Sequence, residues 1–277
     1  MYISIDLGGT GTRIIASTDL STEGIIEEVK YDTPQDFEPA FDKIVSSIKV
    51  VLKNESIDAI AVALAGIVNE ERSELIVAAN IPDYANKNLK AKLEKDFNCK
   101  VYLENDTVCA ALAELEFGEA KDINSISYIT VSTGIGGAFI TKEDGLKIFE
   151  AQVGHQMIGL HGKQCACDQR GCIETYAGGK SLSERFLRDA SNIDDLRIWE
   201  DTVEYLAIAC TNFLNLFLPD VLVLGGGMIQ NNEYVKNKIE KEIRNQMRIS
   251  EVPPILISNF VDEVGVYGGL ALIKNSI

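Results

Sequence analysis

The chain contains one short pattern twice, a strand followed by a glycine-rich turn and a second strand. The first copy runs over residues 2–16 and turns at Gly8-Gly9, and the second runs over 125–140 and turns at Thr133-Gly134-Ile135-Gly136-Gly137. Such a repeat predicts two similar lobes. We expect the first lobe over residues 1–110, joined by a C-terminal helix at 264–277, and the second over 111–263.

Strands and helices are mixed along the rest of the chain. Apolar residues recur at three- and four-residue steps from Phe37 to Leu52, which indicates an amphipathic helix, and the apolar run Ile57–Leu64 predicts a buried strand. Further strands are expected at 25–31, 101–103, 221–224 and 255–257, and further helices at 89–97, 108–117, 194–218, 229–247 and 264–273. This mixture indicates an α/β architecture. Three strands before the first helix predict an antiparallel flank on a sheet that then turns parallel.

Composition restricts the possible partners. The 277 residues are 46% hydrophobic and 25% charged, which is typical of a globular protein with a core. A formal charge of −16 argues against nucleic acid, because a duplex binder needs a basic surface. No run of ~18 apolar residues and no basic leader is visible, so we expect neither a membrane span nor a signal peptide and place the protein in the cytoplasm.

Three glycine turns follow strands. In the first, Gly8 and Gly9 let the backbone approach an anion, Thr10 and Thr12 add hydroxyl groups, and Asp6 could hold magnesium through water. In the second, Thr133 and Gly134 offer the same chemistry. The third turn, Gly225-Gly226-Gly227, stands where nucleotides bind in open α/β sheets. Ordinary hairpins and a helix cap are the alternatives, but three such turns together favour a divided phosphate and nucleoside site.

Three cysteines, Cys165, Cys167 and Cys172, lie within eight residues. With one histidine they match a closed tetrahedral zinc site, which would be structural. The chain has two histidines, and either His155 or His161 could complete the set. A disulfide with a spare thiol is the alternative. The other cysteines, Cys99, Cys109 and Cys210, lie in apolar stretches and are interpreted as core.

Asn105-Asp106 follows the apolar run Val101–Leu103 and precedes an alanine- and leucine-rich helical segment. A carboxylate at a strand end is suited to act as a general base. The alternative is that Asp106 caps the helix, and both roles are compatible, because a helix N-terminus favours the ionised carboxylate.

The set of motifs resembles the ROK family (repressors, open reading frames and sugar kinases) of the actin-like ATPase group. The matching pieces cover nearly the whole chain: Asp6-Leu7-Gly8-Gly9-Thr10, Glu104-Asn105-Asp106, Ser132-Thr133-Gly134-Ile135-Gly136-Gly137, Gly154-His155, Cys165-x-Cys167-x4-Cys172-x-Glu174 and Leu224-Gly225-Gly226-Gly227. The resemblance implies a two-lobed actin-like (ribonuclease H-like) fold, each lobe a mixed sheet flanked by helices. It also implies a homodimer formed through the second lobe.

The resemblance further implies phosphorylation of a hexose or hexose derivative by ATP with Mg²⁺, and a structural Zn²⁺. Asp106 would take the proton from the attacking sugar hydroxyl. The resemblance also favours His155 over His161 as the fourth zinc ligand. The sugar would be bound by Asn105, His155 and Glu174, beside a wall formed by Gly66 and Asn80. The nucleotide would be bound by Asp6, Gly8, Gly9, Thr10, Thr12, Thr133, Gly134, Gly225, Gly226 and Gly227.

Two residues depart from the family pattern. Gln152 stands where sugar kinases of the family usually carry Glu, and Ala65 stands where they usually carry Pro. Because Asp106 and the cysteine cluster are intact, we interpret Gln152, which can still bind a hydroxyl, as a change of sugar specificity. A non-catalytic sugar-binding protein and a sugar-sensing transcriptional regulator are the rival readings. The regulators carry an additional N-terminal DNA-binding segment, whereas the first strand here begins at Tyr2.

Overall fold

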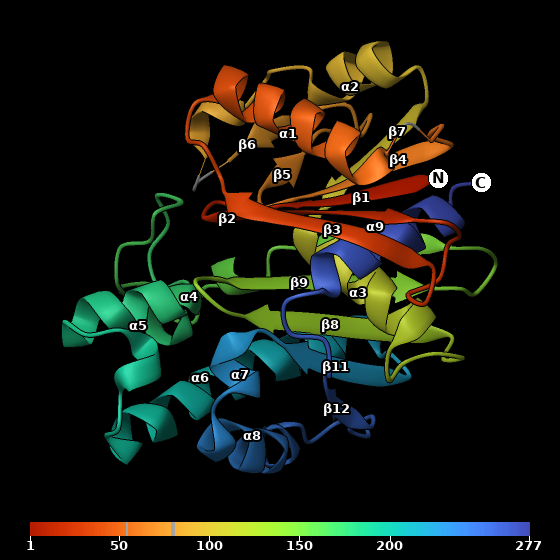
Figure 1. Cartoon of the computed structure of the whole chain (residues 1–277). Coiled ribbons are helices and arrows are strands. Elements are labelled where there is room, and N and C mark those ends of the chain that lie inside the picture. The colour runs from red at the N-terminus through yellow and green to blue at the C-terminus, as the bar shows by residue number, and fades with distance from the viewer. Residues whose placement is uncertain (54, 79–80) are drawn as a thin grey trace. The chain divides into compact units, whose positions relative to one another are not determined.

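The structure is a computed structural model that describes residues 1–53, 55–78 and 81–277 (Figure 1). It contains two compact units. The first unit comprises residues 1–117 and 262–277, and the second comprises residues 118–261. Helix α3 (Asp106–Phe117) lies wholly in the first unit, so the expected boundary at residues 110/111 falls inside a helix. Helix α9 (Val264–Lys274) also belongs to the first unit.

The first unit is built on a mixed sheet with the strand order β3-β2-β1-β4-β7. Its strands are β1 (Tyr2–Leu7), β2 (Gly11–Ser17), β3 (Ile25–Asp32), β4 (Ala59–Leu64) and β7 (Lys100–Asn105). Strands β1, β2 and β3 are antiparallel to one another, while β4 is parallel to both β1 and β7. This is the antiparallel flank on a parallel sheet that the sequence predicts.

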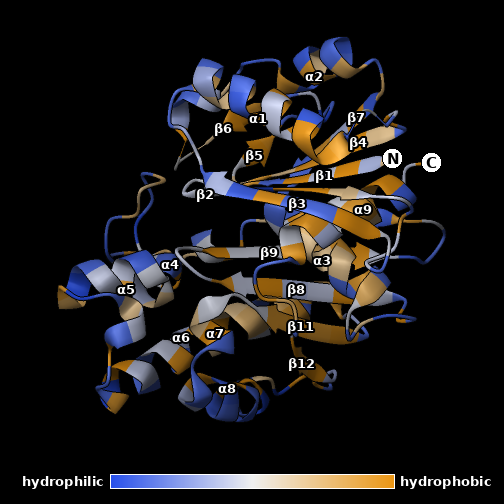
Figure 2. Cartoon of the chain, in the orientation of Figure 1, coloured by the Kyte–Doolittle hydropathy of each residue, from blue (hydrophilic) through white to orange (hydrophobic). Residues whose placement is uncertain are grey.

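Helices cover both faces of this sheet (Figure 1). Helices α1 (Phe37–Leu52) and α2 (Leu89–Phe97) lie on one face, and α3 and α9 lie on the other. Strand β4 is therefore buried along its whole length. Helix α9 is apolar almost throughout, as its colour in Figure 2 shows, because it packs against α3, β1 and β4. The carboxyl ends of β1, β4 and β7 are adjacent, so the segments that follow them are brought together.

A small hairpin follows β4 in the first unit. Its strands β5 (Ile67–Val68) and β6 (Leu75–Val77) pair antiparallel, and the short helix η1 (Pro82–Tyr84) comes after it. The sequence does not predict this hairpin, because strands of two and three residues carry no alternation that can be recognised.

The second unit is built on a sheet with the order β10-β9-β8-β11-β12. Its strands are β8 (Ser125–Val131), β9 (Ile135–Thr141), β10 (Lys147–Ala151), β11 (Val221–Gly225) and β12 (Ile255–Ile257). Strands β8, β9 and β10 are antiparallel, and β11 is parallel to both β8 and β12. The second glycine turn therefore repeats the topology of the first, as the repeated sequence pattern predicts.

The helices of the second unit are α4 (Glu174–Ala177), α5 (Gly179–Phe186), α6 (Leu196–Phe217), α7 (Gly227–Gln230) and α8 (Glu233–Gln246), with short helices η2 (Val153–His155) and η3 (Ala190–Asn192). Helix α6 begins where the Asp195 carboxylate accepts a hydrogen bond from the Arg197 N–H. The single helix expected over 229–247 is instead divided into α7 and α8, because Asn232 caps α8 by accepting from the Val235 N–H at 3.1 Å. The predicted fold class, two mixed sheets flanked by helices, is confirmed.

Candidate active site

Strand β7 ends at Asn105 and helix α3 begins at Asp106. The Asn105 Oδ1 accepts hydrogen bonds from the N–H groups of Thr107 at 2.8 Å and Val108 at 3.1 Å, so Asn105 caps the helix. The Asp106 Oδ1 also accepts from the Thr107 N–H, at 2.7 Å. Asp106 is partly exposed, whereas Asn105 is buried. The cap therefore comes mainly from the neighbour of the predicted base.

Asn105 also fixes the turn at Gly66. Its Nδ2 donates to the Gly66 carbonyl at 2.9 Å. Gly66 has φ 155°, and a Cβ there would lie 2.2 Å from the Val77 carbonyl oxygen, so the position accepts only glycine. This is the turn that was expected beside the sugar. Asn80, which was expected to help form the same wall, lies outside the described residues.

Asp6 lies on β1, and its carboxylate interacts electrostatically with that of the predicted base, Asp106. Burial, together with the negative charge of Asp106, raises the pKa of Asp6 from 3.8 to about 7, and Arg13 opposes the rise. A Cβ at Gly265 would lie 2.4 Å from the Asp6 carboxyl carbon, so α9 closes over this carboxylate. On its open side Asp6 lines a hollow of about 420 Å³.

The first glycine turn is held in place by the segment after β3. Thr33 donates to the Gly8 carbonyl at 2.8 Å, and Gln35 donates to the Gly9 carbonyl at 3.2 Å. The Thr33 N–H also donates to the Thr10 carbonyl at 2.8 Å. The Thr12 hydroxyl, which was expected to contact phosphate, is buried and shares a hydrogen bond of 2.8 Å with the Thr33 hydroxyl.

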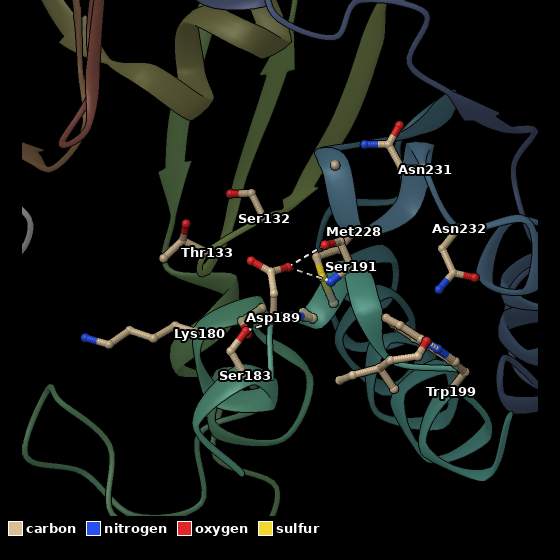
Figure 3. A pocket seen from close by; sticks show the side chains of 14 residues that line it. Ser132, Thr133, Lys180, Ser183, Asp189, Ser191, Trp199, Met228, Asn231 and Asn232 are labelled. Carbon is tan, nitrogen blue, oxygen red and sulfur yellow. Dashed lines mark hydrogen bonds between the residues drawn. The ribbon is translucent and has the colours of Figure 1, made fainter. Parts of the chain in front are cut away.

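In the second unit a cavity of about 600 Å³ opens beside Thr133 (Figure 3). It is lined by Ser132, Thr133, Gly179, Lys180, Ser183, Asp189, Ala190, Ser191, Ile193, Trp199, Gly227, Met228, Asn231 and Asn232. Of the residues predicted to bind nucleotide, Thr133 and Gly227 are in this set. The sequence does not predict the remaining lining residues, because most of them come from residues 179–199, which contain no recognisable nucleotide motif.

Helix α5 brings its first residues to the second glycine turn. The N–H groups of Gly179 and Lys180 donate to the carbonyls of Ser132 and Thr133, each at 2.9 Å. Figure 3 shows the Lys180 side chain extending on the same side of the cavity as Thr133. Lys180 is exposed and is the one Lys or Arg among the residues that line the cavity. Lys180 and Thr133 therefore place a cation and a hydroxyl on the same side of the cavity.

The remaining wall is polar in one place and apolar in another. The Asp189 carboxylate accepts from the Ser191 N–H at 2.8 Å and the Ser191 hydroxyl at 2.5 Å, and these bonds lower the pKa of Asp189. Trp199 donates its Nε1–H to the Ile193 carbonyl at 2.9 Å, which fixes the indole in the wall. The cavity thus offers a cation at one end, a carboxylate in the middle and a flat apolar surface beyond (Figure 3).

The three glycines after β11 serve different purposes. A Cβ at Gly225 would lie 2.2 Å from the Tyr128 hydroxyl, so this residue is required for packing on β8. Gly226 has φ 88°, and a Cβ there would lie 2.3 Å from the Val131 carbonyl. Gly227 starts α7 and lines the cavity. Two of the three therefore have a packing reason, independent of any ligand.

His155, Cys165, Cys167 and Cys172 converge on one point. Their ligand atoms all lie within 4.8 Å of one another. The Cys165 Sγ lies 3.6 Å from the His155 Nδ1, and the Cys167 Sγ lies 3.7 Å from the Cys172 Sγ. A tetrahedral site with Zn–S of about 2.3 Å has sulfur–sulfur edges of about 3.8 Å, so these residues fit zinc.

The structure also resolves the alternatives for this cluster. The cysteines are free, so the disulfide is not formed, and His161 is not part of the group. The loop is shaped by Gly171, with φ 77°, and by a bridge between Met157 and Cys172. Because His155 turns Nδ1 to the cluster, its Nε2 is the nitrogen that could meet a ligand.

Two predicted sugar residues lie near this loop. Gln152 is exposed and donates through Nε2 to the Glu150 carboxylate at 2.8 Å. The Glu174 Oε2 accepts from the Ile135 N–H at 2.8 Å, and a Cβ at Gly134 would lie 2.5 Å from the same oxygen. Glu174 is thus built into the second glycine turn.

The fold with its glycine turns is that of the actin-like ATPases. The ROK family model matches residues 2–276, and the chain belongs to the ROK family. It is 27% identical to a glucokinase from Thermotoga maritima, over 99% of this chain and 98% of that protein. It is 30% identical to a xylose repressor from Bacillus spizizenii, over 68% of this chain, and it spans about half (53%) of the repressor.

Solved structures share the fold. A ROK family glucokinase from Streptomyces griseus, in complex with glucose and AMPPNP, superposes with a TM-score of 0.81. It is 23% identical and covers 98% of each chain.

Among the residues that the structure describes, no helix combines the length and apolar character that crossing a membrane requires.

Proposed function

We propose that the protein phosphorylates a hexose or hexose derivative with ATP, and that Asp106 is the general base. The observation that carries the proposal is the fixed position of Asp106 at the junction of β7 and α3, beside an Asn105 that is bonded to Gly66. The chain is similar over nearly its whole length to a glucokinase, which supports this class of reaction.

The chemical step follows from the carboxylate. Asp106 accepts the proton of the attacking sugar hydroxyl, and the sugar oxygen forms a bond to the γ-phosphorus while the bond to the β–γ bridging oxygen breaks and ADP leaves. A positioned base contributes roughly 10²–10⁴ in rate. The Gly66 carbonyl and the α3 N–H groups fix the orientation of the Asn105 side-chain amide. The amide is therefore held in place to orient a neighbouring sugar hydroxyl.

The second unit would bind the nucleotide in the cavity beside Thr133. The Thr133 hydroxyl and Lys180 suit the phosphates, Asp189 suits the ribose hydroxyls, and Trp199 with Met228 suits the base. The Streptomyces griseus relative binds AMPPNP, which supports ATP as the donor. Mg²⁺ would supply charge neutralisation at the phosphates. In the first unit, Asp6 is the carboxylate proposed to bind a hydrated Mg²⁺.

Zinc would have a structural role. A closed site of three cysteines and His155 has no open coordination position, and it would fix the segment between η2 and α4. Gln152 and His155 lie just before this segment and Glu174 lies just after it, and all three are proposed to contact the sugar. Holding them at one ion fixes the sugar side of the second unit without adding chemistry.

The test is a coupled ADP-release assay over glucose, fructose, N-acetylmannosamine and a glycoside, with the wild type and Gln152→Glu. We expect turnover of at least one sugar, and a changed order of preference in Gln152→Glu, because a carboxylate cannot donate as the Gln152 amide does. Absence of turnover with every sugar would reject the kinase proposal.

The rival function is sugar binding without catalysis. The similarity to a xylose repressor at 30% identity is the observation that favours it. In that case isothermal titration would show sugar binding, while the ADP-release assay would show no turnover in the wild type.

A further inference from the structure

An ion pair joins the hairpin β5–β6 to strand β7, which ends one residue before the proposed base. The Arg72 Nε lies 3.2 Å from the Glu104 Oε2. The Glu104 side chain is 5% exposed and that of Arg72 is 36% exposed. Glu104 is therefore a buried carboxylate that receives its countercharge from a residue in the hairpin loop.

The loop is shaped to present Arg72. Its backbone is in the left-handed region, with φ 51°, a conformation that is costly for a non-glycine residue. Asn69 holds the turn, because its Oδ1 accepts from the Ser73 N–H at 2.8 Å and its carbonyl accepts from the Arg72 N–H at 3.0 Å. The guanidinium thus projects from a braced turn.

Glu104 transmits the contact to the base. Its Oε1 accepts from the N–H of Asn105 at 2.8 Å, and Asn105 in turn holds Gly66 and caps the helix that starts at Asp106. Together Arg72–Glu104 and Asn105–Gly66 join the hairpin to the end of β7 at two points. Displacement of the Glu104 carboxylate would move the Asn105 backbone and with it Asp106.

We propose that Arg72 is a positioning residue, which acts through Glu104 and Asn105 to set Asp106 against the turn at Gly66. The inference rests on the proposed function. Removing one partner of a buried ion pair leaves an uncompensated charge, and removing both is far milder. A shift of about 1 Å in a reacting group can lower a rate about 10²-fold.

The test is a double-mutant cycle with Arg72→Met, Glu104→Gln and the double variant, together with Arg72→Lys. We expect Arg72→Met to lower kcat about 10-fold or more, with the KM for ATP within twofold of wild type. Arg72→Lys should recover part of kcat, and the double variant should be more active than Arg72→Met. Arg244→Met, which removes an exposed ion pair with Glu240 on α8, is the control and should match the wild type.

A purely structural role would lower the melting temperature but leave kcat unchanged when measured well below it. An Arg72→Met kcat within twofold of wild type, or a double variant no better than Arg72→Met, would overturn the inference. If the wild type turns over no sugar, the proposed function fails, and the inference is then decided by titration calorimetry. Sugar affinity about 10-fold weaker in Arg72→Met and recovered in the double variant supports it, and unchanged affinity rejects it.

Discussion

The carboxylate of Glu174 accepts a hydrogen bond of 2.8 Å from the backbone N–H of Ile135. This bond joins the start of α4 to the second glycine turn. Glu174 lies two residues after Cys172 of the Cys/His cluster. A Cβ at Gly134 or Gly154 would lie 2.5 Å or 3.1 Å from the Glu174 Oε2, so both glycines leave room for it. Glu174 was expected to hold sugar, and the structure gives it a second reason to be a carboxylate.

Replacing Glu174 should separate its acceptor role from its charge. Glu174→Ala leaves the Ile135 N–H without its partner, so we expect the free energy of unfolding to fall by about 1–3 kcal/mol. Glu174→Gln keeps a side-chain oxygen in place and should lose much less. Urea unfolding followed by circular dichroism measures both. Equal losses in the two variants would show that the bond to Ile135 is not what stabilises the turn.

Metal content is predicted from the Cys/His cluster. The wild type should bind about one zinc per chain, and Cys167→Ser should lose it, because a hydroxyl is a poor zinc ligand. Cys99→Ser, outside the cluster, is the matched control and should keep its zinc. The measurement is inductively coupled plasma mass spectrometry after dialysis against metal-free buffer. Equal zinc in Cys167→Ser and wild type would contradict the site.

Lys180 should recognise phosphate and not the nucleoside. We expect Lys180→Met to weaken ADP binding about 10-fold, because a charge-assisted hydrogen bond is lost, and to leave adenosine binding unchanged. Lys180→Arg should keep most of the ADP affinity. Titration calorimetry with the two ligands measures the difference. An ADP affinity within twofold of wild type in Lys180→Met would remove Lys180 from the phosphate site.

The pKa of Asp6 predicts a pH-dependent stability. Because the folded-state pKa, about 7, lies above the unfolded value of 3.8, the folded state retains a proton that the unfolded state releases. The contribution of Asp6 to the free energy of unfolding is thus most favourable below pH 4, and it is lost as the pH rises to about 7. Asp6→Asn removes the penalty and should exceed the wild type by on the order of 2–4 kcal/mol at pH 8 in metal-free buffer.

The comparison with Asp6→Asn is made by urea unfolding at pH 4.5 and pH 8. The difference between variant and wild type should be small at the lower pH and large at the higher one. Asp144→Asn, in an exposed loop, is the control and should show no such trend. A pH-independent difference for Asp6→Asn would mean that Asp6 titrates normally.

The sequence predicts those features that depend on neighbours along the chain. Both glycine hairpins, the strand that ends at Asn105 and the cysteine spacing are local patterns, and the structure contains all of them. The spacing leaves His155 and His161 open as zinc ligands. Only the folded loop, which brings the His155 Nδ1 to 3.6 Å from the Cys165 Sγ, decides between them.

Features built from distant segments could not be read in this way. The cavity wall depends on Gly179 and Lys180 bonding to the carbonyls of Ser132 and Thr133, more than forty residues earlier. Likewise, the contact between Arg72 and Glu104 joins a loop to a strand, and neither residue belongs to a recognisable pattern with the other. Such pairings arise from tertiary packing, which periodicity does not encode.

The central claim is that Asp106 is the base of a sugar kinase, and the most direct measurement is the turnover of Asp106→Asn with sugar affinity determined on the same sample. We predict that kcat falls by roughly 10²–10⁴ while titration calorimetry still detects sugar binding, because the amide keeps the shape of the carboxylate but cannot take the proton. A kcat close to that of the wild type would contradict the assignment.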